Sequence, residues 1–257
     1  MKLIDIINII EENYPKNLSY EWDNAGLFFG DKNKDIKRVI VTLDITMDVI
    51  NQALEENADL ILSHHPVIMS GIKTLEDNLM HSEIIKKAIK NDLAIYSAHT
   101  NMDVAKNGIN QKLAELFGFG NIEVLEENPL YKDCGLGRVG ELEKEISIDD
   151  FCEIVKEKLN TPFVRLCKNK DTVKRVCVAS GSCCEYVPLA IEKKADVIIT
   201  GDMKYHNCIE YVYDGISIID AGHFPTEIIV MDMFSELLKN ENIEIIKSKN
   251  QDIFKIR

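Results

Sequence analysis

Two stretches of the chain repeat each other. Residues 36–65 read IKRVIVTLDITMDVINQALEENADLILSHH, and residues 173–202 read VKRVCVASGSCCEYVPLAIEKKADVIITGD. They align without a gap at an offset of 137, and nine of the thirty positions are identical, among them Asp59 and Asp196. Each copy begins and ends on a nearly continuous apolar run, as buried parallel strands do, with an amphipathic helix pattern in between. The repeat therefore predicts two right-handed strand–helix–strand units and an α/β fold.

The likeness continues beyond the repeat. The stretches LAIYSAHTNMD (93–103) and SIIDAGHFPTE (217–227) each contain the end of an apolar strand pattern, followed by a histidine and, four residues later, an acid. The two pairs are His99 with Asp103 and His223 with Glu227. We therefore predict two similar α/β lobes, residues 1–128 and 129–257, related by an internal pseudo-twofold axis. The boundary is expected at the cluster of turn residues 127–129.

Composition limits the possible classes of protein. The chain has 257 residues, of which 46% are hydrophobic and 28% charged, so it can bury a sizeable core and is not globally disordered. Thirty basic against 43 acidic residues give a net charge of −13, which excludes a protein that coats nucleic acid or an anionic membrane with its whole surface. Two local basic runs remain, at 168–175 and 247–257. No apolar run approaches the ~18 residues of a membrane span, and no secretory signal is visible, so we expect a cytoplasmic protein without a membrane partner.

Two features that suggest other chemistry are better explained by packing. All seven cysteines lie between Cys134 and Cys208 and form no CxxC pair, so we expect reduced, mostly buried thiols, with Cys183 and Cys184 as packing residues. Residues 135–140, GLGRVG, match the glycine pattern of a dinucleotide-binding loop. That loop requires a strand before it and a helix that begins at it, and neither is predicted here. We interpret these glycines as part of a tight strand-to-strand connection.

Histidines gather at predicted strand ends. His64 and His65 follow the strand LILS, and His99 and His223 follow the other apolar strands. Ligands bind at the carboxyl ends of strands in open α/β sheets, and imidazole with carboxylate suits divalent transition metals. Because neighbouring side chains of a strand point apart, His64 and His65 can serve one site only if it is wide, as when two ions lie about 3.5–4 Å apart. Such a site stays electropositive and favours a small anionic substrate.

Further polar residues follow the strand that matches LILS in the repeat. Asp202 and His206 are four residues apart and share a face if a helix begins there, which suggests an acid/base pair or a second layer around the metal. The alternative is a helix cap and a surface histidine. Asp44 ends the strand VIVTLD, where it either faces the site or caps the following helix.

The motifs together resemble the NIF-three-like family, many of whose members carry the label "GTP cyclohydrolase I type two homologue". The resemblance spans nearly the whole chain and rests on six motifs in the family's order: Trp22–Leu27, His64–Pro66, His99 with Asp103, Gly135–Gly140, Gly201–His206 and Gly222–Glu227. It implies a two-lobed α/β fold in the family's short form, a dinuclear metal site and a ring-shaped homohexamer. By match of motif, the implied ligands are His64, His65, Asp103, His223 and Glu227, with His99 close by. The site is expected to hold two divalent ions, and the motifs do not distinguish among Fe, Mn, Zn and Ni.

Two functions follow as hypotheses. The first is a metal-dependent hydrolase of a nucleotide-like or phosphorylated substrate, in which His99, Asp202 or His206 moves protons. The alternative is a toroidal hexamer that binds DNA or another nucleic acid, or a transcription partner, with the metal as a structural or regulatory element. We give little weight to the cyclohydrolase label, because it is an inherited name.

Overall fold

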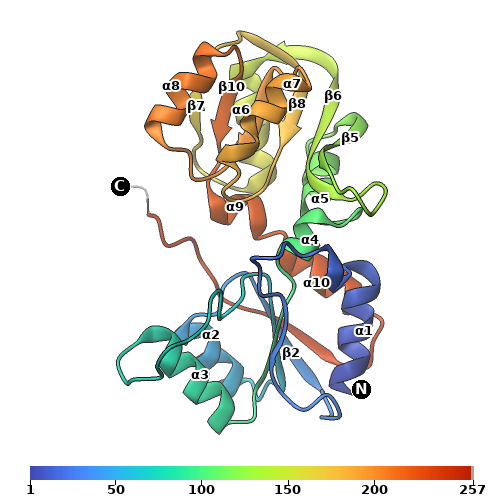
Figure 1. Cartoon of the computed structure of the whole chain (residues 1–257), viewed down its shortest axis with the longest axis vertical. Helices are drawn as coiled ribbons and strands as arrows, with labels where there is room; N and C mark the ends of the chain where they lie inside the picture. Colours follow the sequence, from blue (N-terminus) through green and yellow to red (C-terminus); the bar gives the residue numbers. More distant parts are fainter. Residues whose placement is uncertain (256–257) are drawn as a thin grey trace. The chain divides into compact units, whose positions relative to one another are not determined.

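The computed structural model describes residues 1–255 and divides the chain into two compact α/β units. The first unit contains Met1–Met102 together with the segment from Ile228 onward, and the second contains Asp103–Glu227. Each unit has its own sheet (Figure 1). The α/β fold class predicted from the repeat is therefore confirmed.

The first unit is built on a five-stranded sheet with the order β1-β4-β3-β2-β11. All neighbours are parallel except β1 and β4. Its elements are α1 (Leu3–Asn13), the 3-10 helix η1 (Lys16–Leu18), β1 (Gly26–Phe29), β2 (Arg38–Thr42), α2 (Met47–Glu55), β3 (Leu60–Ser63), α3 (Met80–Lys90), β4 (Ala94–Ser97), α10 (Val230–Leu238) and β11 (Glu244–Lys247).

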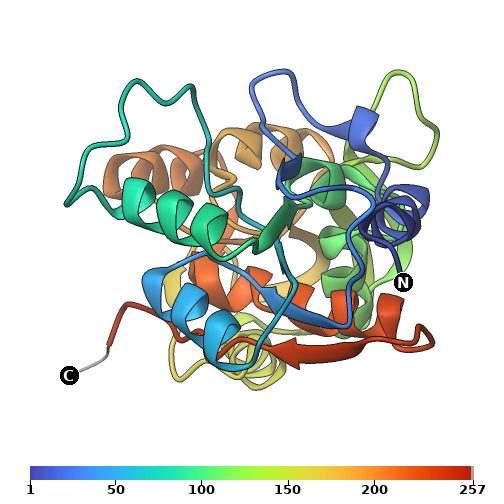
Figure 2. The ribbon, with the colours of Figure 1, turned by 90° about the horizontal axis from the view of Figure 1, so that it is seen from below.

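Alternating side chains divide the core of this unit into two layers. Ile40, Ile61 and Ile95 are aligned in register across β2, β3 and β4, and they pack against α2 and α3. These two helices run side by side (Figures 1 and 2). Because successive strand residues point to opposite faces, the neighbouring residues of the same strands face the other way, where α10 packs on β2 and α1 packs on α10.

The second unit is built on a six-stranded sheet with the order β5-β6-β8-β9-β10-β7, in which β8, β9 and β10 are parallel. Helix α4 (Thr100–Val104) leads into it from the first unit. Its further elements are α5 (Ile109–Leu116), β5 (Gly120–Glu127), β6 (Gly135–Ser147), α6 (Ile148–Leu159), β7 (Arg165–Cys167), β8 (Thr172–Val178), the 3-10 helix η2 (Cys184–Tyr186), α7 (Val187–Glu192), β9 (Val197–Thr200), α8 (Tyr205–Tyr213), β10 (Ser217–Asp220) and α9 (His223–Glu227). The core of this unit resembles that of the first unit. Cys177, Ile198 and Ile218 are aligned in register across β8, β9 and β10, and they share one hydrophobic cluster with residues of α7 and α8.

The division of the chain differs from the sequential halves 1–128 and 129–257. Residues 127–129 lie at the connection between β5 and β6, which pair as antiparallel neighbours inside the second unit. There the Asn128 side chain accepts hydrogen bonds from the backbone N–H groups of Leu130 and Tyr131. The last part of the chain returns to the first unit because β11 pairs in parallel with β2. These turn residues therefore connect two strands of a hairpin and do not form a linker between the units.

The glycine motif and the cysteines have the packing roles expected of them. Gly135–Gly140 lies within β6, paired with β5 and β8, and no helix begins there. The next helix begins after Ser147, whose Oγ accepts a hydrogen bond from the Asp150 N–H. All seven cysteines are free thiols, and Cys183 is buried in a hydrophobic cluster. Within residues 1–255, no helix is both long enough and apolar enough to cross a bilayer.

Candidate metal centre

His64 and His65 extend from the carboxyl end of β3. The Nδ1 atom of His64 lies 2.8 Å from the backbone oxygen of Ala98, and that of His65 lies 2.7 Å from Asp44 Oδ1. A carbonyl oxygen can only accept, so His64 Nδ1 carries the proton, and the lone pair of the neutral ring is on Nε2. Asp44 Oδ1, as the acceptor of this hydrogen bond, fixes the same tautomer in His65.

His99 follows β4 and is held by Asp23. Its Nδ1 lies 2.7 Å from Asp23 Oδ1, while Asp23 Oδ2 accepts hydrogen bonds from the backbone N–H and the hydroxyl of Thr100. The Asp23 side chain is fully covered. This burial by itself raises the pKa of the carboxyl, but the hydrogen bonds from His99 and Thr100 outweigh it and lower the pKa to about 2. At neutral pH Asp23 is therefore a carboxylate, and it orients His99.

These three histidines form one cluster in the first unit. The ring centroids are 5.0 Å apart for His64 and His65, 5.2 Å for His64 and His99, and 5.6 Å for His65 and His99. One ring nitrogen from each lies within 4.8 Å of the others, and His64 is completely buried. Since Nδ1 of every ring is bonded to an oxygen acceptor, Nε2 is the atom that each ring offers to a metal.

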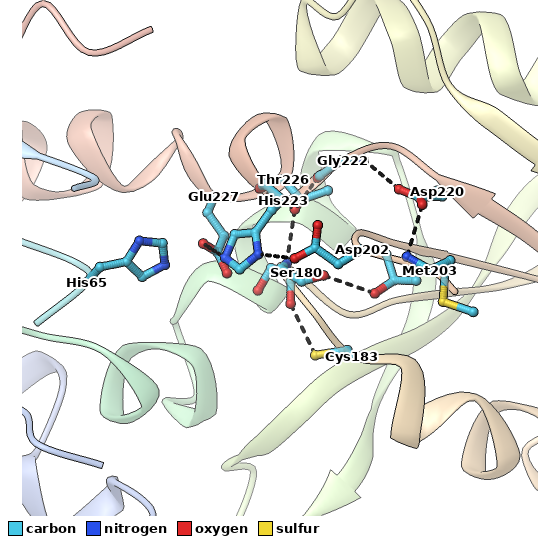
Figure 3. Close-up of polar contacts among 12 residues, drawn as sticks. His65, Ser180, Cys183, Asp202, Met203, Asp220, Gly222, His223, Thr226 and Glu227 are labelled. Carbon is cyan, nitrogen blue, oxygen red and sulfur yellow. Dashed lines mark hydrogen bonds and ion pairs between the residues drawn. The ribbon is translucent and has the colours of Figure 1, made fainter. Parts of the chain in front are cut away.

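The second unit has its own arrangement of a histidine and two carboxylates around α9. His223 Nδ1 lies 2.7 Å from Asp202 Oδ2, and His223 Nε2 lies 2.9 Å from Glu227 Oε2, so the three side chains form a line (Figure 3). The Glu227 side chain is almost fully buried. Gly181 approaches it so closely that a Cβ on this glycine would lie 2.1 Å from Glu227 Oε1. Asp103, the other acid of the two pairs, is also buried and lies on α4.

Hydrogen bonds fix the loops that carry this arrangement. The Thr226 hydroxyl oxygen accepts a hydrogen bond from the backbone N–H of Gly181, with an N···O distance of 3.0 Å. Asp220, at the end of β10, accepts hydrogen bonds from the N–H groups of Met203 and Gly222. Asp202 itself has a left-handed φ of 56°, an uncommon conformation for a residue other than glycine. The loop after β9 is thus shaped to bring the Asp202 carboxylate to His223.

The donor atoms fit a divalent metal. When Nδ1 of His223 donates to Asp202, the lone pair on Nε2 faces a carboxylate oxygen at 2.9 Å, and two such atoms repel unless a proton or a cation lies between them. Two ligand atoms that are each bound at about 2.1 Å, at right angles around one ion, lie about 3 Å apart. The mixture of imidazole and carboxylate without thiolate suits zinc, iron, manganese or nickel.

The predicted site residues are mostly found in these two arrangements. His64, His65 and His99 come together in the first unit, and His223, Glu227 and Asp202 come together in the second. His206 does not join them: α8 begins only at Tyr205, so Asp202 precedes the helix and shares no face with His206. In the described residues no hydrogen bond or ion pair joins the Asp202 and His206 side chains, and the catalytic role of His206 stays a prediction.

Two orienting carboxylates were not assigned from the sequence. The sequence is compatible with two roles for Asp44, facing the site or capping the following helix; in the structure Thr46 caps α2, and Asp44 binds His65. In the sequence Asp23 stands out only as a member of the motif Trp22–Leu27, although it holds His99 across 76 positions of the chain. The available signal was an acid in a short polar turn, and nothing in its spacing indicated its partner.

Comparison with known proteins identifies the family. Residues 1–253 match the family model described as Duf34/NIF3 (NGG1p interacting factor 3). The chain belongs to the Duf34/NIF3 family. Among family relatives, a Clostridium perfringens protein named "GTP cyclohydrolase 1 type 2 homolog" is 38% identical over 253 residues, with 97% of each chain covered.

Solved structures agree with this assignment. A Bacillus cereus protein described as related to NIF3 matches with a TM-score of 0.91 and 27% identity, covering 100% of this chain and 99% of that one. A Methanocaldococcus jannaschii protein, described as reduced HcgD, matches with a TM-score of 0.86 and 35% identity, covering 97% and 98%. The resemblance inferred from the motifs is therefore confirmed for the whole fold of this family member.

Proposed function

We propose that this chain binds two divalent metal ions and uses them to hydrolyse a small anionic substrate that is nucleotide-like or phosphorylated. The observation that carries the proposal is the shared state of four histidines: His64, His65, His99 and His223 each direct Nδ1 to an oxygen acceptor. Such partners fix the tautomer and raise the basicity of metal-binding imidazoles. Four independent instances at strand ends favour a metal centre over ordinary buried histidines.

The proposed ligands are His64, His65, Asp103, His223 and Glu227. Three of them, His64, Asp103 and Glu227, are buried, and burying ionisable groups is costly unless a partner or a metal compensates. Bound divalent ions supply Lewis-acid chemistry, lowering the pKa of a bound water and polarising a phosphoryl or carbonyl oxygen. Their charge would exceed that of the two carboxylate ligands, which favours an anionic substrate.

His99 is proposed to hold and move a proton at Nε2. The Asp23 carboxylate keeps Nδ1 protonated and stabilises the positive ring that forms when Nε2 takes up a proton. Asp202 stands in the same relation to His223, so in our proposal it orients this ligand. The expected signature of the His99→Ala variant is retained metal and lost turnover; a loss of metal in parallel with activity makes His99 a ligand instead.

Metal analysis of purified protein tests the metal centre. We expect the His65→Ala, Glu227→Ala double variant to lose bound metal while it stays folded, because these ligands lie at the ends of elements rather than in the apolar clusters. The control is the His81→Ala, Glu236→Ala variant, which removes the same two functional groups from exposed positions of α3 and α10. Full metal content in the first variant would refute the ligand assignment. A hydrolysis screen with nucleotides and phosphoesters, with and without a chelator, then tests the reaction.

The alternative, a nucleic-acid-binding ring, has weaker support from the surface charges. In the run 168–175, Lys168 lies 3.0 Å from Asp171, and Arg175 forms ion pairs with Glu123 and Glu141. In the C-terminal run, Lys247 forms an ion pair with Asp232. Cations already paired with carboxylates attract phosphates less strongly than unpaired ones. A steep fall of DNA affinity with salt concentration would favour this alternative.

A further inference from the structure

The only tryptophan of the chain lies beside the histidine cluster and is exposed. Trp22 retains 62% of its accessible surface, although tryptophan is on average a highly buried residue. The centroid of its ring lies 6.2 Å from that of His99, with the two planes at 80°. A large aromatic surface is thus held in contact with a group of the proposed metal centre, within the same unit.

The loop that carries Trp22 is fixed. The Tyr20 ring stacks on Trp22 with a centroid distance of 5.8 Å and an angle of 13° between the planes. The backbone N–H of Tyr20 donates to the Thr100 hydroxyl, and the Asp23 carboxylate accepts from Thr100 and His99. Asn24 donates from its side chain to the backbone oxygen of Ile68. Hydrogen bonds on both sides of Trp22 therefore hold its backbone, and the Tyr20 ring supports its indole, so that ordering this loop on binding costs little entropy.

The chemistry of an exposed, fixed indole is that of a stacking surface. An aromatic side chain stacks on every nucleobase because all of them have a π face, and each such stack contributes about 1–3 kcal/mol. A partner ring that lies on Trp22 is next to His99, so a polar group attached to that ring is within reach of the histidines. An aliphatic phosphoester would leave the indole uncovered.

We propose that Trp22 is the platform on which the substrate's flat heteroaromatic ring, of the nucleobase class, stacks during binding. The inference rests on the proposed function only for the assignment of the neighbouring site as the reaction centre. It narrows the substrate class from anionic compounds in general to those that join a nucleobase to a phosphate or another polar group. Tyr20 supports the platform from its stacked position and is a positioning residue.

The test is equilibrium binding of guanosine 5′-monophosphate, with ribose 5-phosphate as the same anion without a base. Because Trp22 is the only tryptophan, its fluorescence reports on this position alone. We expect guanosine 5′-monophosphate to quench it in a saturable manner and ribose 5-phosphate to leave it unchanged. In equilibrium dialysis, Trp22→Ala should raise the Kd for the nucleotide about 5- to 150-fold, the range that corresponds to one lost stack, and Trp22→Phe should raise it less. Phe163→Ala, which removes an exposed aromatic of the other unit, should not change it.

Three results would each overturn the role of Trp22 as a platform. The first two are an unchanged nucleotide affinity in Trp22→Ala, and equal affinities of the wild type for the nucleotide and for ribose 5-phosphate. The third is protection of Trp22 from acrylamide quenching in the absence of nucleotide, which would show that another protein surface covers it. The binding assay needs no turnover. If the protein binds the nucleotide through Trp22 but contains no metal and hydrolyses nothing, the proposed function fails and the platform stands. If the protein hydrolyses its substrate in a metal-dependent manner but Trp22→Ala does not change binding, the platform fails and the proposed function stands.

Discussion

At Gly181 the backbone passes so close to a proposed ligand that only glycine fits. Its φ is +65°, and an added Cβ would lie 2.1 Å from Glu227 Oε1 and 3.3 Å from His223 Nε2. The left-handed conformation costs other residues roughly 1–2 kcal/mol, and here the side chain would also displace the carboxylate. Gly181 is thus required both by its conformation and by the position of Glu227.

We predict that Gly181→Ala lowers both the free energy of unfolding and the metal content. The matched control is Gly118→Ala, since Gly118 has a φ of +75° in the same unit but no atom within 4 Å of the added Cβ. Both variants should lose about 1–2 kcal/mol in urea unfolding from backbone strain, and only Gly181→Ala should lose metal in elemental analysis. Equal metal content in the two variants would contradict the role of Glu227 as a ligand.

At the scale of elements, the sequence repeat reappears as identical strand pairing. In the first unit Val39 pairs with Leu60, and in the second Val176 pairs with Val197, each shifted by the same 137 positions. Asp59 explains part of the shared sequence: its Oδ2 accepts hydrogen bonds from the N–H groups of residues 37 and 38. Asp196 does the same for residues 174 and 175. Each carboxylate thereby joins the start of one strand to the start of the next.

We predict that Asp59→Ala and Asp196→Ala each destabilise the fold by about 1–3 kcal/mol, because two backbone donors lose a charged acceptor. The repeat supplies the control. Glu55 and Glu192 are also identical at this offset, but both are exposed, and within residues 1–255 their carboxylates have no hydrogen bond. Glu55→Ala and Glu192→Ala should change the free energy of unfolding by less than about 0.5 kcal/mol. Equal effects of the Asp and Glu variants in urea unfolding would show that the shared carboxylates do not stabilise the strand pairs.

At the scale of the whole molecule, α8 carries a stripe that a single chain leaves uncovered. Tyr205, Ile209 and Tyr213 are four residues apart on one helix face and are 75%, 52% and 89% exposed. If two copies of α8 pack antiparallel about Ile209, Tyr205 faces the partner's Tyr213, and Lys204 faces the partner's Asp214. This arrangement matches opposite charges at both ends of the stripe, so a second copy of the chain is the occupant we propose.

We predict that the chain forms the homohexamer implied by the family resemblance and that this stripe contributes to it. Light scattering at micromolar concentration should report a hexamer for the wild type and smaller species for Ile209→Lys and Tyr213→Lys. Leu130→Lys is the control, because Leu130 is also an exposed apolar residue but lies in the β5–β6 connection outside the stripe. A monomeric wild type would contradict the predicted hexameric ring. A hexamer unaffected by both α8 variants would assign the contact to another surface.

The amino-acid sequence by itself determined the strand–helix–strand repeat, the α/β class and the location of the histidines at strand ends. These follow from local patterns, since continuous apolar runs and helical periodicity need no knowledge of distant residues.

The tertiary structure decided which distant groups meet. It placed β11 beside β2, and this pairing, formed across about 200 positions, moved the unit boundary away from the turn at 127–129. It also joined Asp23 to His99 and separated Asp202 from His206. Hydrogen-bond partners of this kind depend on where loops end in space, and sequence spacing does not specify that position.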